Sequence, residues 1–195
     1  EGLRYAFGNP ATRALVAVGA LPYLLLVPVW GTLFPIYAKD VFGAGPQGLG
    51  WLLTAVGAGG TLGGFIANAL SRRERQGRIQ AAWIVVMCAA LAGIAASPTL
   101  AVAMACGFVG GAAEMAHTAS NMAMLQVTAP DEMRGRIVSL TMLYPALISA
   151  GAFLAGPLSD LLGVRGASLA LAGAALLAVS LMYLCSTHLR ELRLK

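Results

Sequence analysis

A short series of polar side chains interrupts one of the apolar stretches of this sequence. The carboxylate of Glu114 is followed by His117, Thr118 and Asn121, and residues three, four and seven positions apart lie on one face of a helix. A carboxylate inside a membrane is costly unless it pairs, faces a cavity or binds a proton, so Glu114 is a candidate for function. In the functional interpretation, Glu114 takes up and releases a proton, His117 modulates it or contacts substrate, and Asn121 donates a hydrogen bond to substrate. In the structural interpretation, the same residues only join neighbouring helices.

The composition predicts the elements that must position these residues. Of 195 residues, 58% are hydrophobic and 11% are charged, against about 25% charged in soluble domains. The apolar stretches are long enough for membrane helices of about 20 residues, and too long for outer-membrane strands of about 9 to 11. The sequence therefore predicts an all-α membrane protein.

Charged residues delimit six predicted transmembrane helices. A segment 1–13 precedes them, and a basic tail 188–195 follows. The predicted helices span about residues 14–38, 47–70, 79–96, 100–127, 137–162 and 168–187.

The basic residues are divided unequally between the two sides of such a bundle. One side has only Lys39 and Arg165, and the other side has the remaining eleven of the 13 Lys and Arg residues. Because cytoplasmic loops of membrane proteins are rich in Lys and Arg, both ends of this segment are expected in the cytoplasm and the protein in the inner (plasma) membrane. The eleven are Arg4, Arg13, Arg72, Arg73, Arg75, Arg78, Arg134, Arg136, Arg190, Arg193 and Lys195.

Two short motifs suggest an internal repeat. Gly64 and Asn68 end the second helix of the first predicted triplet, and Gly156 and Asp160 end the second helix of the other triplet. Both read G-x-x-x-[ND], and the charge distribution places them on opposite sides. Two inverted three-helix repeats are a transporter architecture.

The first and second predicted spans carry residues that bend or pack helices. Pro22, Pro28 and Pro35 of the first span, and Pro145 and Pro157 of the fifth, are expected to kink their helices. Tyr23, Trp30 and Tyr37 lie seven positions apart and are candidates to line a pathway for an aromatic or amphipathic molecule. The interpretation preferred for Tyr37, as for Trp51 and Tyr183, is that of an anchor at the membrane interface. The second span carries a glycine-rich face, which predicts close helix packing. Its glycines are Gly57, Gly59, Gly60, Gly63 and Gly64.

At this point the sequence resembles the carboxy-terminal half of a major facilitator superfamily transporter, of the drug-efflux and enterobactin-exporter branch. The segment 125–136, LQVTAPDEMRGR, is similar to the loop between that family's tenth and eleventh helices. The opening 1–5 with Asn9 and Pro10 is similar to the end of its central cytoplasmic loop, and the resemblance therefore implies that residues 1–13 form the end of that loop. The segment that begins with Gly64 departs from the family's loop motif, because Asn68 replaces an acid and Ala69 and Leu70 precede the arginines.

The resemblance implies half of a twelve-helix secondary transporter. Its partners would be a missing amino-terminal half, the lipid bilayer, a small hydrophobic or amphipathic substrate of drug or siderophore type, and protons. Transport would proceed by alternating access. The residues assigned to gating motifs are Gly64, Asn68, Gly156, Asp160, Arg134 and Arg136. The two arginines are also candidates to bind lipid headgroups or the other half.

Two alternatives belong to other classes. A catalytically silent six-helix scaffold would bind partners without supporting flux. An intramembrane enzyme is disfavoured, because there is no G-x-S-x-G motif and the two histidines, His117 and His188, have no evident nucleophile partner. No cofactor, metal site or nucleic-acid partner is predicted, since the three cysteines show no ligand spacing and the basic residues form short clusters.

Overall fold

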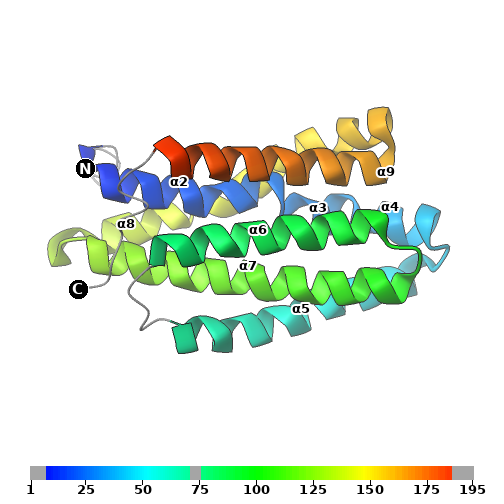
Figure 1. The fold of residues 1–195 in the computed structure, drawn as a ribbon, viewed down its shortest axis with the longest axis horizontal. Coiled ribbons are helices and arrows are strands. Elements are labelled where there is room, and N and C mark those ends of the chain that lie inside the picture. The colour runs from blue at the N-terminus through cyan, green and yellow to red at the C-terminus, as the bar shows by residue number, and fades with distance from the viewer. Residues whose placement is uncertain (1–7, 71–75, 186–195) are drawn as a thin grey trace.

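The computed structural model describes residues 8–70 and 76–185 of the chain, and within these ranges every regular element is helical. The long helices run side by side as a bundle (Figure 1). In chain order the elements are α2 (Pro10–Leu25), α3 (Pro28–Thr32), α4 (Phe34–Ile36), the π-helix η1 (Tyr37–Val41), α5 (Gly45–Leu70), α6 (Gln76–Ala96), α7 (Leu100–Thr128), the 3₁₀ turn η2 (Asp131–Met133), α8 (Arg134–Thr141) and α9 (Tyr144–Cys185).

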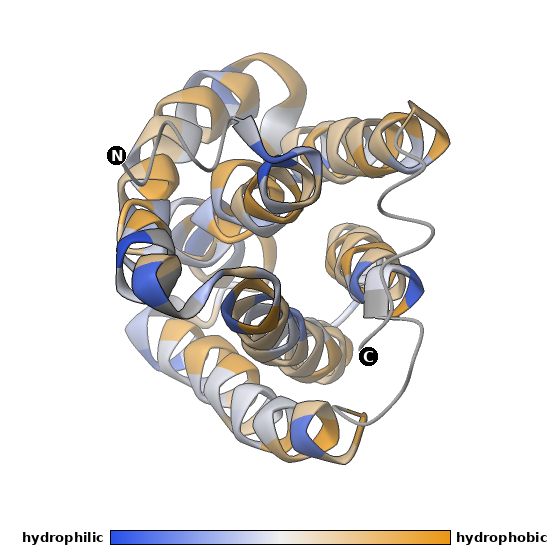
Figure 2. Cartoon of the chain, turned by 90° about the vertical axis from the view of Figure 1, so that its left-hand side faces the viewer, coloured by the Kyte–Doolittle hydropathy of each residue, from blue (hydrophilic) through white to orange (hydrophobic). Residues whose placement is uncertain are grey.

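Five segments of the described chain are long and apolar enough to cross a membrane. Figure 2 looks along the bundle and shows mostly hydrophobic helix walls, with hydrophilic residues at several of the helix ends. Large apolar side chains are exposed on these walls, including Phe65 at 71% and Phe153 at 82%. Such exposure suits lipid rather than water. The prediction of an all-α membrane protein is confirmed at this level.

The last of these segments is one long element with a break. α9 contains Gly163, whose φ of 70° and ψ of 163° are not helical. Only glycine adopts this conformation readily. The chain reverses its direction along the bundle within α9, so that its end returns toward the side where α2 begins (Figure 1).

The first helix begins earlier than the expected boundary at residue 14. The side chain of Asn9 accepts hydrogen bonds from the backbone N–H groups of Ala11 at 3.0 Å and Thr12 at 3.2 Å. Pro10 occupies the first helical position, where a missing N–H costs nothing. This cap and the proline start α2 within the segment 1–13 that was predicted as a loop.

The prolines break the first span as predicted. A proline has no N–H to offer the carbonyl four residues before it. The N–H groups of Leu26 and Val27 both bond to the carbonyl of Pro22, at 2.8 and 2.9 Å, and α3 starts anew at Pro28. Between Pro10 and Val41 the span therefore consists of α2, α3, α4 and η1 instead of one straight helix.

The glycines of α5 pack against α7 with almost no space between the backbones. A Cβ atom at Gly59 would overlap the carbonyl group of Phe108, and one at Gly63 would overlap that of Ala112. In return, a Cβ atom at Gly111 of α7 would overlap the carbonyl of Val56. The prediction of close packing along the glycine-rich face is confirmed for these residues.

At the opposite end of the bundle from the start of α2, polar bonds join segments that are distant in sequence. The hydroxyl of Tyr37 donates to Ser168 Oγ at 3.0 Å, and Arg165 Nη2 donates to the carbonyl of Ser97 at 3.0 Å. Tyr37 is 0% exposed, so it does not act as the interfacial anchor that the sequence suggested. By contrast, Trp51 is 58% exposed, as an anchor requires.

Tyr37→Phe is expected to lower the thermal stability of the purified protein modestly. The variant keeps the buried ring but loses the bond to Ser168, and bonds between membrane helices contribute about 0.6 kcal/mol on average. Thermal unfolding in detergent, followed by circular dichroism, would measure the change. The double variant Tyr37→Phe, Ser168→Ala should lose less stability than the sum of the losses in the two single variants. Strictly additive losses would show that the bond contributes nothing.

Candidate functional site

The centre of the site is a hydrogen bond between the first span and α7. The indole Nε1 of Trp30, in α3, donates to Glu114 Oε2 at 2.8 Å. Glu114 lies at the middle of α7, and its side chain is partly exposed, while Trp30 is 8% exposed. Among the residues between Leu100 and Thr128, Glu114 is the one with a formal charge. Within residues 8–70 and 76–185, Trp30 is thus the donor that the structure gives for this carboxylate, and it is a neutral one.

A second contact joins the same two spans one turn further along α7. The Tyr23 hydroxyl lies 3.1 Å from Thr118 Oγ1, which itself donates to the backbone carbonyl of Glu114 at 2.9 Å. Because the Thr118 hydrogen is used in this way, Tyr23 is the donor between the two hydroxyls. Tyr23 also packs on Tyr144 with ring centroids 5.3 Å apart.

Asn121 binds two neighbouring helices. Its Nδ2 donates to the carbonyl of Leu15 at 2.9 Å and to Oε1 of Gln80 at 3.4 Å. Asn121 is 2% exposed. The structural interpretation, in which the amide joins helices, therefore describes this residue better than a direct role in binding substrate.

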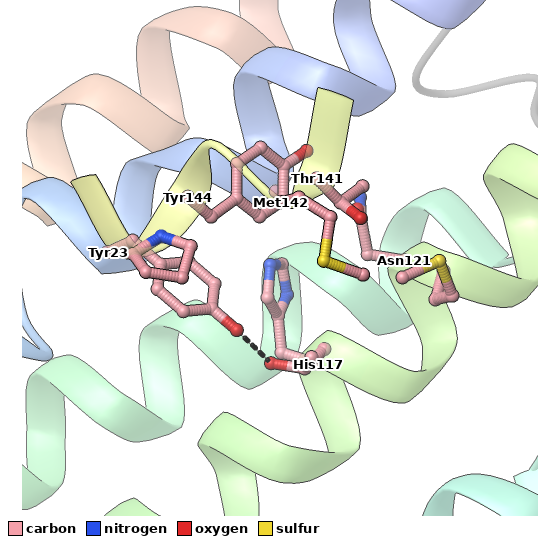
Figure 3. A pocket seen from close by; sticks show the side chains of 10 residues that line it. Tyr23, His117, Asn121, Thr141, Met142 and Tyr144 are labelled. Atoms are coloured by element: carbon pink, nitrogen blue, oxygen red, sulfur yellow. Dashed lines mark hydrogen bonds between the residues drawn. The ribbon is translucent and has the colours of Figure 1, made fainter. Parts of the chain in front are cut away.

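His117 is one of the buried polar residues with side-chain atoms that lack a hydrogen-bond partner among the described residues; Thr12 Oγ1, Gln80 Nε2 and Trp83 Nε1 also lack one. His117 is 1% exposed, and neither ring nitrogen has a partner that meets hydrogen-bond geometry, while the backbones of Val18 and Gln80 lie close enough to interact weakly with the ring. The imidazole lines a cavity of about 150 Å³ and points into it, together with Tyr23, Asn121 and Tyr144 (Figure 3). Figure 3 also shows the bond between Tyr23 and Thr118 as a dashed line.

The residues predicted for gating lie away from this cluster. Asn68 is near the end of α5 and Asp160 precedes the break at Gly163, and both side chains are exposed. Arg136 is exposed and approaches the Met133 sulfur at 3.9 Å. None of these three contributes to the cavity lining, and neither do Gly64 or Gly156. The side chain of Arg134 and the basic residues 71–75 and 188–195 lie outside the described residues.

Several residues of the site could not be assigned a role from sequence. Gln80 lies at the start of α6 and is 1% exposed; a polar residue just inside an apolar span was its one signal. Tyr144 donates to the carbonyl of Val16 at 3.1 Å. Tyr144 is the first residue of α9, after a two-residue gap from α8. Its one signal in the sequence was the helix-bending Pro145 that follows it.

The family of the chain follows from comparison with known proteins. The family model described as "Transmembrane secretion effector", which belongs to the major facilitator superfamily, matches residues 1–193. This match covers nearly the whole sequence.

Curated relatives include proteins named multidrug efflux pump Tap. The protein of Mycolicibacterium fortuitum is 34% identical over 173 residues, which is 88% of this chain and 42% of the relative. The protein of Mycobacterium tuberculosis (strain ATCC 25618 / H37Rv) is 32% identical over 174 residues, again 88% of this chain and 41% of the relative. The chain thus spans about two fifths of the length of these relatives. With its apolar helical bundle and the family match over residues 1–193, this chain belongs to the transmembrane secretion effector family of the major facilitator superfamily, a family of membrane transporters and not of enzymes.

Proposed function

We propose that this chain is the carboxy-terminal half of a proton-coupled drug exporter. The observation that carries the proposal is the bond between Trp30 and Glu114, which holds a carboxylate at mid-helix in an otherwise uncharged span. Ionisable residues at such a depth commonly belong to proton or substrate pathways. The named function of the Tap relatives, multidrug efflux, supports export of small hydrophobic or amphipathic molecules.

The proposed half has six membrane crossings. The break at Gly163 divides α9 into two helical parts, which adds a crossing to the segments that end at Val41, Leu70, Ala96 and Thr128. The two sets of three crossings would form inverted repeats, with the G-x-x-x-[ND] motifs toward opposite ends of the bundle. Alternating access would then be a rocking of this half against an amino-terminal half around a midplane site.

The protein would lie in the inner membrane, with the start of α2 on the cytoplasmic side. The distribution of basic residues supports this orientation. Arg13 and Arg78 lie near the beginnings of α2 and α6, which share one end of the bundle (Figure 1). Lys39 lies in η1, and Arg165 bonds to Ser97 in the turn between α6 and α7, which is at the other end. This division among the described residues follows the positive-inside rule.

The test is drug efflux from cells that lack their own major pumps. The chain is co-expressed with a candidate amino-terminal half, and efflux of a panel of fluorescent dyes and siderophores is measured with and without an uncoupler of the proton gradient. We expect dye efflux when both halves are present and loss of efflux with the uncoupler.

Each other result has a definite meaning. Siderophore efflux without dye efflux would change the substrate class. Efflux that survives the uncoupler would contradict proton coupling. If protease accessibility shows that both halves are correctly inserted in the membrane but no efflux is measured, the silent scaffold would be favoured instead.

A further inference from the structure

The cavity beside His117 has the features of a binding site. It lies among α2, α7 and the junction of α8 with α9, and its volume is about 150 Å³. Met142, in the gap between α8 and α9, is 70% exposed and leaves the cavity reachable from outside the bundle. Its lining residues are Gly19, Tyr23, His117, Thr118, Asn121, Met122, Thr141, Met142, Tyr144 and Pro145.

The donors of the other polar side chains in the lining are already used. Thr141 Oγ1 donates to the carbonyl of Val138 at 2.6 Å. The hydroxyls of Tyr23, Thr118 and Tyr144 and both amide hydrogens of Asn121 are bound as described above.

The imidazole of His117 is the exception. A neutral imidazole carries one N–H donor and one nitrogen acceptor. Neither ring nitrogen has a partner in hydrogen-bond geometry at 1% exposure, and the ring has only weak interactions with the backbones of Val18 and Gln80. Burying a polar group without a hydrogen bond is costly. The cavity therefore presents one unsatisfied polar group, aimed into it, to whatever binds there.

The remaining walls define the body of the ligand. Two tyrosine rings and the thioethers of Met122 and Met142 contribute apolar, polarisable surface, and sulfur makes favourable contacts with aromatic rings. An apolar cavity of about this volume accommodates one benzene ring. Charged side chains are absent from the lining of this cavity as described, so an ionised ligand would lose its hydration without a counter-charge.

We propose that this cavity binds one neutral, ring-sized phenolic group, whose hydroxyl makes a hydrogen bond with His117 and whose ring packs between the tyrosines and methionines. The role of the cavity as a subsite for phenolic substrates rests on the proposed export function. Binding of the ring itself does not, because it requires no flux.

Binding is tested with 4-fluorophenol and fluorobenzene, which differ by the hydroxyl, on the purified full chain in detergent by ¹⁹F NMR. We expect saturable binding of 4-fluorophenol, about fivefold tighter than that of fluorobenzene, as one net hydrogen bond provides. His117→Phe should abolish this preference. His188→Ala, at the only other histidine, is the matched control and should keep it.

A second measurement covers the case in which His117→Phe misfolds. In the His188→Ala protein, His117 is the single histidine, so its ¹⁵N imidazole resonances report on this site alone. They should shift on addition of 4-fluorophenol and stay unchanged on addition of the same volume of buffer without the phenol. Equal affinity for the two probes, an unchanged imidazole signal, or a hydroxyl preference that survives His117→Phe would each overturn the proposal.

Efflux then separates the two levels of the inference. With both halves expressed, His117→Phe should reduce efflux of phenolic dyes more than efflux of dyes without a hydroxyl. Binding that depends on His117, together with equal efflux losses, would keep the site and refute its role as a substrate subsite. If the unmodified chain and the amino-terminal half together show no efflux, the proposed export function is refuted, whereas the binding result is unaffected.

Discussion

Glu114→Gln is expected to reduce proton-driven efflux by about tenfold or more when both halves are present. In the unmodified protein, Trp30 Nε1 donates to Glu114 Oε2 at 2.8 Å. Glutamine keeps the shape of the side chain and an oxygen that can accept this hydrogen bond. It cannot take up or release a proton. The variant therefore removes the proposed coupling chemistry while the contact between α3 and α7 is preserved.

Transport of a dye into everted membrane vesicles, driven by an imposed proton gradient, measures this effect. Asp40→Asn is the matched control, because Asp40 is an exposed acid at the end of the first span and lies outside the site. We expect the control to transport like the unmodified protein. Unchanged coupling in Glu114→Gln, at equal protein level, would assign Glu114 to structure and place the coupling group in the other half.

Gly59→Ala is expected to destabilise the bundle strongly, in spite of the higher helix propensity of alanine. The new Cβ atom would overlap the backbone carbonyl of Phe108, so that α5 and α7 must move apart. Overpacking of this kind costs about 1–3 kcal/mol. Combining the change with Gly63→Ala, which meets Ala112 in the same way, should prevent accumulation of folded protein.

Gly57→Ala provides the matched control on the same helix. Nothing lies within 4 Å of a Cβ atom at Gly57, so alanine there should raise stability by up to about 1 kcal/mol through helix propensity. The difference is measured by thermal unfolding of the unmodified, Gly59→Ala and Gly57→Ala proteins in detergent, together with their monodispersity in size-exclusion chromatography. Equal melting of Gly59→Ala and Gly57→Ala would contradict the close packing of α5 on α7.

The local consequences of the sequence were predictable because they depend on nearby residues. Uncharged apolar runs, such as the one between Arg13 and Lys39, predict membrane helices, since a buried charge has a high cost in lipid. Pro22 and Pro28 predict a broken first span, because a proline removes a hydrogen bond within its own helix. The glycines of α5 predict a face on which another helix can approach closely.

The sequence by itself thus determined the class of the protein, its helices and the candidate carboxylate, because these follow from interactions within one helix and with lipid. It did not determine partners. Only the tertiary structure decided that Trp30 binds Glu114, 84 positions away, and that Tyr37 binds Ser168, 131 positions away. The tertiary structure also places the ring nitrogens of His117 beside a cavity, without a partner in hydrogen-bond geometry. The physical reason is that a hydrogen bond between helices depends on how the helices are placed and rotated, and that placement results from the packing of the whole bundle.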